Sequence, residues 1–237
     1  MLSPTAHDGL LKVSGIDAKK FLQGQLSCDV EAITSTQTSL GAHCNPQGRV
    51  ISLFRLFLYQ DAYYLLMPAS MINIAMQALK KYAVFFKVEM NDASAALSDI
   101  AEQVSLENYT DILKGIPAIY PETSGKFLPH DLNLPNLNAV NFHKGCYTGQ
   151  EIIARMHYKA TLKNRLYHAT INSPITIQPG MEVYCNANQT KQVVGTVVDV
   201  SKEEQPTHVL LLTDTKNAQN EHLFLAQNDN VFFTILN

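Results

Sequence analysis

The chain has 237 residues, of which 46% are hydrophobic and 16% charged, a composition that excludes a disordered chain and suits one large domain or two smaller ones. The formal charge of -3 argues against a general nucleic-acid coat, because neutralising phosphates requires a surplus of lysine and arginine. No apolar run is long enough to span a bilayer, and the first residues match neither a signal peptide nor a transit peptide. We therefore expect a cytoplasmic protein with no direct nucleic-acid partner and no membrane partner. Because the sequence has no heptads, we also expect a monomer.

The first predicted elements are a strand over residues 10–13 and a helix that begins at Asp17. The Asp17 side chain is expected to cap the first free N–H groups of this helix. Ile16 and Phe21 occupy the two positions of a hydrophobic staple, so both are predicted to be buried. The helix is predicted to end near residues 27–29.

Two strand patterns follow, over residues 49–59 and 63–67, with a short polar turn between them. Ser70 is expected to cap a helix over residues 71–82, and a further strand is predicted over 84–90. Strands that alternate with two helices indicate an α+β layer, with the helices on one face of a largely antiparallel sheet.

The second half of the chain has a different pattern. Residues 110–142 contain four prolines and are predicted to form ordered loops and turns. Beyond them, short β-like runs separated by turn residues predict a small closed β-barrel. These runs cover residues 165–171, 181–185, 192–200, 208–213, 223–226 and 231–236.

The densest group of unusual residues lies at 141–151. Thr148 and Glu151 have the spacing of a capping box, which predicts a helix start that follows Cys146 directly. A helix N-terminus and the Lys144 ammonium would both favour the thiolate form of Cys146.

Two glycines, Gly145 and Gly149, flank this thiol and would permit close approach of another group. The alternative is a buried structural cysteine, with Lys144 pointing to solvent.

This segment resembles the signature of a known family. Phe127-Leu128-Pro129-His130, followed by the run Asn-Phe-x-Lys-Gly-Cys-Tyr-x-Gly-Gln-Glu from Asn141, is similar to the signature of the YgfZ family of folate-binding, iron–sulfur-related proteins. Residues 13–18, 21–25 and 45–50 look like the other landmarks of that family.

The resemblance implies the fold of the glycine cleavage T-protein, an α+β aminomethyltransferase-like fold with antiparallel sheets and helices plus a C-terminal β-barrel. Residues 1–160 would form the folate-binding region, as two interleaved subdomains, and residues 161–237 the barrel. Tetrahydrofolate or a derivative would be the cofactor. In the implied site, Cys146 is the reactive residue, and Lys144 and Tyr147 belong to the same catalytic group. The residues implied to bind the cofactor are Arg49, Lys144, Gly149, Gln150, Glu151 and Arg155.

The implied function is that of an accessory protein for iron–sulfur cluster assembly or repair on client enzymes, including tRNA-modifying ones. The alternative is a folate-dependent one-carbon transferase. Aminomethyl transfer itself is not expected, because the T-protein pattern Gly-x-x-Asp-Asp is replaced after Gly48 by a stretch without an acid. General acid–base help of this kind is worth about 10²–10⁴-fold in rate.

Two further kinds of site would use the same thiol. A zinc or iron site would need several ligands to converge, and a Cys–His hydrolase would need a nearby base. The four cysteines have no C-x-x-C spacing, so we expect no metal or cluster held by this chain alone. The candidate partners of Cys146 are His143, His43 and Cys44 for a metal, and His143, His157 and His168 for a base.

Overall fold

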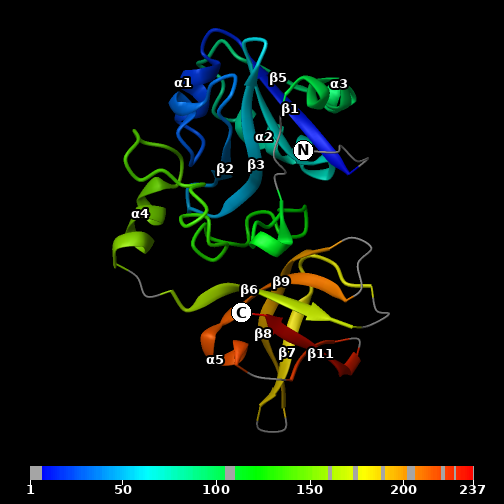
Figure 1. Cartoon of the computed structure of the whole chain (residues 1–237). Helices are drawn as coiled ribbons and strands as arrows, with labels where there is room; N and C mark the ends of the chain where they lie inside the picture. Colours follow the sequence, from blue (N-terminus) through cyan, green and yellow to red (C-terminus); the bar gives the residue numbers. More distant parts are fainter. Residues whose placement is uncertain are drawn as a thin grey trace.

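The computed structural model describes residues 7–104, 110–159, 162–172, 176–187, 190–201, 206–219, 222–226 and 228–236. The first part of the chain forms a five-stranded sheet with helices, and the last part forms a closed β-barrel (Figure 1). This arrangement confirms the predicted α+β class with a C-terminal barrel.

The five-stranded sheet has the order β2-β3-β4-β1-β5, and all its pairings are antiparallel. Strands β3 and β4 form a hairpin whose turn residues, Gln60 and Asp61, have φ of 46° and 59°. Positive φ at both central positions gives the turn the twist that two-residue hairpins need. The strands predicted at 10–13, 49–59 and 63–67 are confirmed. The bounds are β1 (Asp8–Ser14), β2 (Ser39–Cys44), β3 (Val50–Tyr59), β4 (Ala62–Pro68) and β5 (Glu89–Asp92).

The two predicted helices, α1 and α2, lie on one face of this sheet, as expected, and α3, which was not predicted, covers the other face. Alternate side chains of β4 point to opposite sides, so Leu65 packs in the core that contains α1 and α2, whereas Leu66 packs with α3. The α-helices are α1 (Ala18–Gln23), α2 (Ile72–Lys80), α3 (Leu97–Gln103), α4 (Gln150–Lys159) and α5 (Thr215–Ala218). The short 3₁₀ helices are η1 (Val30–Ala32), η2 (Ala69–Met71), η3 (Ser94–Ala96) and η4 (Ile112–Lys114).

The predicted start of α1 is wrong in its details. Ile16 is 87% exposed and makes no staple, although Phe21 is buried. Asp17 occupies the N-cap position, but its carboxylate accepts a hydrogen bond from the Lys87 backbone N–H instead of capping the helix. The helix also ends at Gln23, earlier than predicted.

The next helix and strand also differ from the prediction. Ser70 lies inside η2 and does not cap a helix, and α2 begins at Ile72. Residues 84–88 form no strand, because Val84 and Phe85 lie in an exposed turn; β5 begins only at Glu89. Strand β2 was not predicted.

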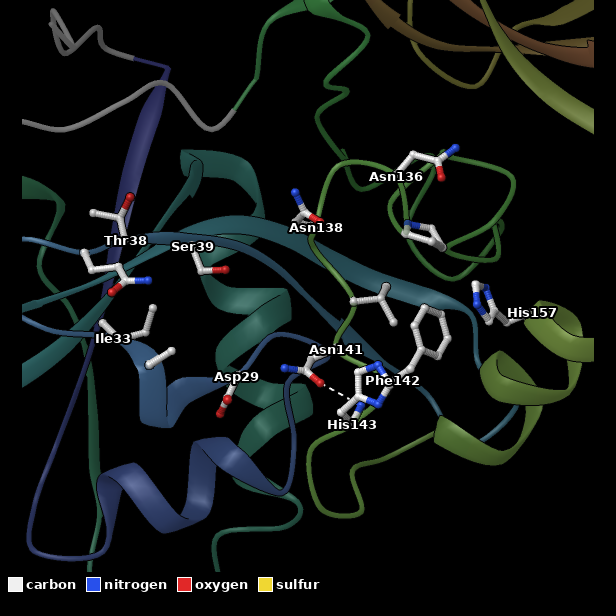
Figure 2. Close-up of a pocket in the computed structure, with 14 residues that line it drawn as sticks. Asp29, Ile33, Thr38, Ser39, Asn136, Asn138, Asn141, Phe142, His143 and His157 are labelled. Carbon is white, nitrogen blue, oxygen red and sulfur yellow. Dashed lines mark hydrogen bonds between the residues drawn. The ribbon is translucent and has the colours of Figure 1, made fainter.

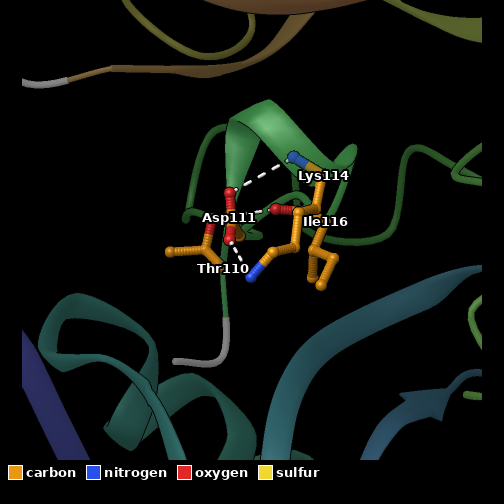
Figure 3. Close-up of polar contacts among 4 residues, drawn as sticks. All are labelled: Thr110, Asp111, Lys114 and Ile116. Atoms are coloured by element: carbon orange, nitrogen blue, oxygen red, sulfur yellow. Dashed lines mark hydrogen bonds and ion pairs between the residues drawn. The ribbon is translucent and has the colours of Figure 1, made fainter. Parts of the chain in front are cut away.

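The proline-rich segment forms turns, as predicted. Its first turn is closed by backbone hydrogen bonds in both directions between Asp111 and Ile116, each 2.8 Å long, and by an ion pair of 2.9 Å between Lys114 and Asp111 (Figure 3). Thr110 precedes this turn, and its hydroxyl lies 3.0 Å from both the Ile116 carbonyl oxygen and Oδ2 of Asp199 in β8.

The buried Asp199 carboxylate connects the barrel to this segment. It accepts hydrogen bonds from the backbone N–H groups of Ala118 (2.7 Å) and Val200 (2.8 Å) and from the Tyr120 hydroxyl (3.1 Å). Burial raises the pKa of Asp199, and these donors oppose that shift. The contacts hold β8 against the α+β part of the chain.

The barrel closes in the strand order β10-β11-β6-β9-β8-β7, which confirms the predicted barrel. The predicted boundary between residues 160 and 161 lies outside the described residues. Among the helices that the structure describes, none combines the length and apolar character needed to cross a membrane. The barrel strands are β6 (Asn164–Ile171), β7 (Glu182–Ala187), β8 (Thr190–Val200), β9 (Thr207–Asp214), β10 (Leu223–Leu225) and β11 (Asn228–Leu236).

Candidate functional site

Three segments far apart in sequence meet at the start of α4. The Thr148 backbone N–H donates to the Gly24 carbonyl (3.2 Å), and the Thr148 hydroxyl donates to Oε1 of Gln25 (3.0 Å). Gly149 has a φ of +83°, and a Cβ there would lie 2.5 Å from the Asn45 carbonyl oxygen. Only glycine suits both the backbone angle and this close approach.

The predicted capping box does not form. The Thr148 hydroxyl is directed to Gln25, and Glu151 is exposed. Helix α4 begins at Gln150, whose side chain accepts a hydrogen bond from the Tyr147 backbone N–H (3.3 Å). Cys146 therefore lies four residues before the helix, farther from its N-terminus than predicted.

Lys144 connects the motif loop to the segment that follows α1. Its ammonium donates to the carbonyl oxygens of Leu26 (2.8 Å) and Cys28 (2.7 Å) and lies 5.2 Å from the centre of the Tyr147 ring. Burial lowers the pKa of Lys144 from 10.5 to about 8, against nearby negative charges that raise it. The alternative in which Lys144 points to solvent is therefore wrong. Its action on the Cys146 thiol stays a prediction.

Cys146 is exposed, whereas the other three cysteines are buried. Burial raises the pKa of Cys28 to about 11 and that of Cys44 to about 12, so both remain protonated thiols near neutral pH. The alternative of a buried structural cysteine at position 146 is thus wrong. Of the four thiols, Cys146 is the one that a solute or a partner protein can reach.

Several polar atoms near this loop are buried without a hydrogen-bond partner among the described residues. They include the Tyr147 hydroxyl, both ring nitrogens of His43 and the Ser52 hydroxyl. His43 and Ser52 are directly paired across β2 and β3, so their side chains share one face of the sheet. Burial raises the pKa of Tyr147 and lowers that of His43 to about 4, so both side chains are neutral near pH 7.

A cavity of about 420 Å³ opens beside the motif loop (Figure 2). One wall is the segment from Asp29 to Ser39, and the other is the segment that leads into the motif, with His157 of α4 at its edge. Phe142 and His157 stack, with ring centres 4.0 Å apart. The lining consists of Asp29, Ala32, Ile33, Gln37, Thr38, Ser39, Pro135, Asn136, Asn138, Val140, Asn141, Phe142, His143 and His157.

Asn141 joins the cavity wall to the motif. Its side-chain oxygen accepts hydrogen bonds from the backbone N–H groups of His143 (2.7 Å) and Lys144 (3.0 Å), which fixes the turn just before Cys146. A ligand that orders this wall would therefore also influence the loop that carries the exposed thiol.

The chain is similar in sequence to several curated proteins. It is 32% identical over 215 residues to the tRNA-modifying protein YgfZ of Vibrio vulnificus strain CMCP6, covering 67% of this chain and 66% of that protein, just under two thirds of its length. It is 30% identical over 220 residues to the tRNA-modifying protein YgfZ of Colwellia psychrerythraea strain 34H, covering 67% of this chain and 68% of that protein. The chain belongs to the YgfZ family. It is also 31% identical to an uncharacterized protein of Haemophilus influenzae, covering 79% of this chain and 80% of that protein. A scan against models of protein families finds no match.

Among solved structures, the fold is similar to the glycine cleavage system aminomethyltransferase T of Bartonella henselae. The TM-score is 0.69 at 12% sequence identity, and the match covers 98% of this chain and 83% of that one. This likeness confirms the predicted aminomethyltransferase-like fold.

The residues predicted to contact a cofactor lie around the motif but not in the cavity lining. Arg49 is exposed and donates to the Lys126 carbonyl. Glu151 and Arg155 are exposed on α4. Their roles, and those of Lys144, Gly149 and Gln150, stay predictions.

The other candidate sites receive no support from the geometry. The described residues contain no group of three or more His, Cys, Asp or Glu side chains suited to a metal ion. His43 and Cys44 are buried in β2, whereas Cys146 is exposed. His168 lies in the barrel, where its Nε2 is 2.8 Å from Nδ1 of His208.

The cavity itself was not predicted. The signal that could have indicated it is the run of asparagines in the proline-rich segment, at Asn136, Asn138 and Asn141.

Proposed function

We propose that this YgfZ-family chain is a folate-binding accessory protein that supports iron–sulfur cluster assembly or repair on client enzymes, including enzymes that modify tRNA. The observation that carries the proposal is the asparagine-lined cavity that shares Asn141 with the loop of the exposed Cys146. Relatives with the name tRNA-modifying protein and a fold like that of an aminomethyltransferase support it.

The cavity residues fit a pterin. A volume of about 420 Å³ lies in the range of small-molecule sites. The side-chain amides of Gln37, Asn138 and Asn141 offer both donors and acceptors, as the edge of a pterin requires. The stacked rings of Phe142 and His157 provide an aromatic wall.

The glutamate tail of a folate would leave the cavity. The lining residues include no lysine or arginine, so the anionic tail is expected to extend toward solvent. When bound, tetrahydrofolate supplies nitrogen atoms that carry one-carbon groups. The chain's own residues hold the pterin, fix the motif loop through Asn141 and Lys144, and present the Cys146 thiol to a client protein.

The second candidate function is a folate-dependent one-carbon transferase. The aminomethyltransferase-like fold favours it. Against it, residues 48–53 supply no carboxylate at the position where the T-protein has its acidic pair.

Calorimetry with tetrahydrofolate tests the cavity. Asn138 has a φ of +56°, so Asn138→Gly removes the amide and retains the backbone conformation. Asp61→Gly is the matched control, because Asp61 also has a positive φ (59°) but lies in the remote β3–β4 turn. We expect weaker binding for Asn138→Gly and unchanged binding for Asp61→Gly. No binding of tetrahydrofolate to the wild type would refute the proposal.

Cys146→Ala separates the two candidate functions. For an accessory protein, this variant loses support of iron–sulfur enzymes in cells, and the purified wild type turns over no one-carbon donor. Turnover by the wild type that Cys146→Ala abolishes would favour the transferase instead.

A further inference from the structure

Two neighbouring turns display apolar side chains to solvent. The first is closed by a 3.0 Å hydrogen bond from the Ala18 N–H to the Gly15 carbonyl and has Ile16 at its centre. The second is closed by a 2.9 Å hydrogen bond from Phe86 to Ala83 and has Val84 and Phe85 at its centre. The exposed fractions are 87% for Ile16, 76% for Val84 and 94% for Phe85. Turn centres usually carry Gly, Pro, Asn, Asp or Ser, so three apolar tips in one place indicate a contact surface.

The two turns are fixed to one another. The Asp17 N–H donates to the Lys87 carbonyl (3.4 Å), and the Lys87 N–H donates to the Asp17 carboxylate (2.8 Å). Phe86 points inward and packs on Phe21 of α1, with ring centres 5.3 Å apart. The tips are therefore held outward by a rigid base.

Several exposed lysines lie close to these tips along the chain. Five exposed lysines lie within four residues of a tip along the chain, at the start of α1, at the end of α2 and just after the second turn: Lys19, Lys20, Lys80, Lys81 and Lys87. Only two carboxylates, Asp17 and Glu89, lie on the same described segments, 14–20 and 80–89. These two segments therefore carry a surplus of positive charge in a chain whose formal charge is -3.

We propose that Ile16, Val84, Phe85 and the five lysines form a docking surface for an anionic phospholipid membrane, here called the turn surface. Apolar tips enter the boundary between headgroups and acyl chains, while lysines attract lipid phosphates. A protein partner fits this surface less well, because lysine is depleted at protein–protein interfaces. A single-stranded nucleic acid also fits less well, because it binds to several stacking aromatic side chains, whereas two of these three tips are aliphatic.

This docking does not depend on the proposed folate function. The sequence has no apolar run long enough for a membrane-spanning segment. A protein that docks on the membrane surface needs no such run. The turn surface thus changes the expectation that the chain has no membrane partner.

The chain contains no tryptophan, which allows a direct test. Phe85→Trp places a single tryptophan at the most exposed tip, and Leu113→Trp places one at a site in η4 that is 64% exposed, as a control. With phosphatidylcholine vesicles that contain phosphatidylglycerol, we expect the emission of Phe85→Trp to shift to shorter wavelength and that of Leu113→Trp to stay unchanged. Vesicles of phosphatidylcholine alone or added salt should weaken the shift.

Vesicle sedimentation of variants without the added tryptophan completes the test. Ile16→Ser, and separately Lys80→Glu with Lys81→Glu, should lower the partition coefficient about tenfold, whereas Leu113→Ser should not. Circular dichroism confirms that each variant is folded. The proposal is overturned if the wild type does not sediment with the anionic vesicles or if the variants bind them as well as it does. It is also overturned if Phe85→Trp responds to unfractionated tRNA or to self-association but not to vesicles.

Discussion

Lys144→Met tests whether the ammonium holds the motif loop in place. The substitution keeps most of the aliphatic stem and removes the hydrogen bonds to the carbonyls of Leu26 and Cys28. A hydrogen bond from a charged donor contributes about 1.5–3 kcal/mol. Lys144 is only partly buried, and desolvating its ammonium costs free energy. We therefore take the combined contribution of the two hydrogen bonds to the free energy of unfolding as about 2 kcal/mol. For a chain of this length, that corresponds to a fall in Tm of about 4–8 °C.

Differential scanning calorimetry at neutral pH measures this change, with Lys163→Met as the control on an exposed lysine. The pH dependence gives a second readout. Burial holds the pKa of Lys144 at about 8, below its ordinary 10.5, so between these values the unfolded chain binds more protons than the folded one. The stability contributed by this group therefore rises as the pH increases through that window, and Lys144→Met should lack the rise. Equal Tm values for Lys144→Met and Lys163→Met would refute the anchoring role.

Three further predictions concern the same region. Gly149→Ala should destabilise the fold by about 1–3 kcal/mol in denaturant titration, because of its positive φ and the clash with Asn45, whereas Gly145→Ala, with open space around it, should change stability by less than about 0.5 kcal/mol. Mass spectrometry after brief iodoacetamide treatment of the native protein near neutral pH should find one modified thiol, and none in Cys146→Ala; modification of a buried cysteine first would contradict the burial described. Because burial lowers the pKa of His43 from 6.5 to about 4, stability should fall as the pH decreases through that interval, and His43→Leu should lose less stability over the same range.

The fold was predictable where the side-chain pattern reports burial directly. The β3–β4 hairpin has two apolar runs around a polar turn, and the barrel has short runs at regular intervals. Strand β2 was missed because Gly41 and His43 interrupt its apolar pattern, although both are buried. The strand predicted at 84–90 was wrong over residues 84–88, because Val84 and Phe85 face solvent in a turn, which hydrophobicity alone cannot distinguish from a core strand.

The site was predictable in part, for a related reason. The motif around Cys146 is a continuous string, so its residue types could be read from the sequence. The sequence left both a buried and an exposed thiol open, and the structure shows that the thiol is exposed. The cavity is assembled from the segments Asp29–Ser39 and Pro135–His143, which are about a hundred residues apart, and only the last three residues of the second segment belong to the motif. The partners of Lys144 are backbone carbonyls, and no sequence pattern marks a carbonyl as an acceptor.

The most direct measurement is a crystal structure of the protein grown with tetrahydrofolate. We expect the pterin between the side chains of Asn138 and Asn141 and the stacked rings of Phe142 and His157, beside the loop of Cys146. A pterin bound elsewhere on the chain, with this cavity filled only by water, would contradict the proposed site.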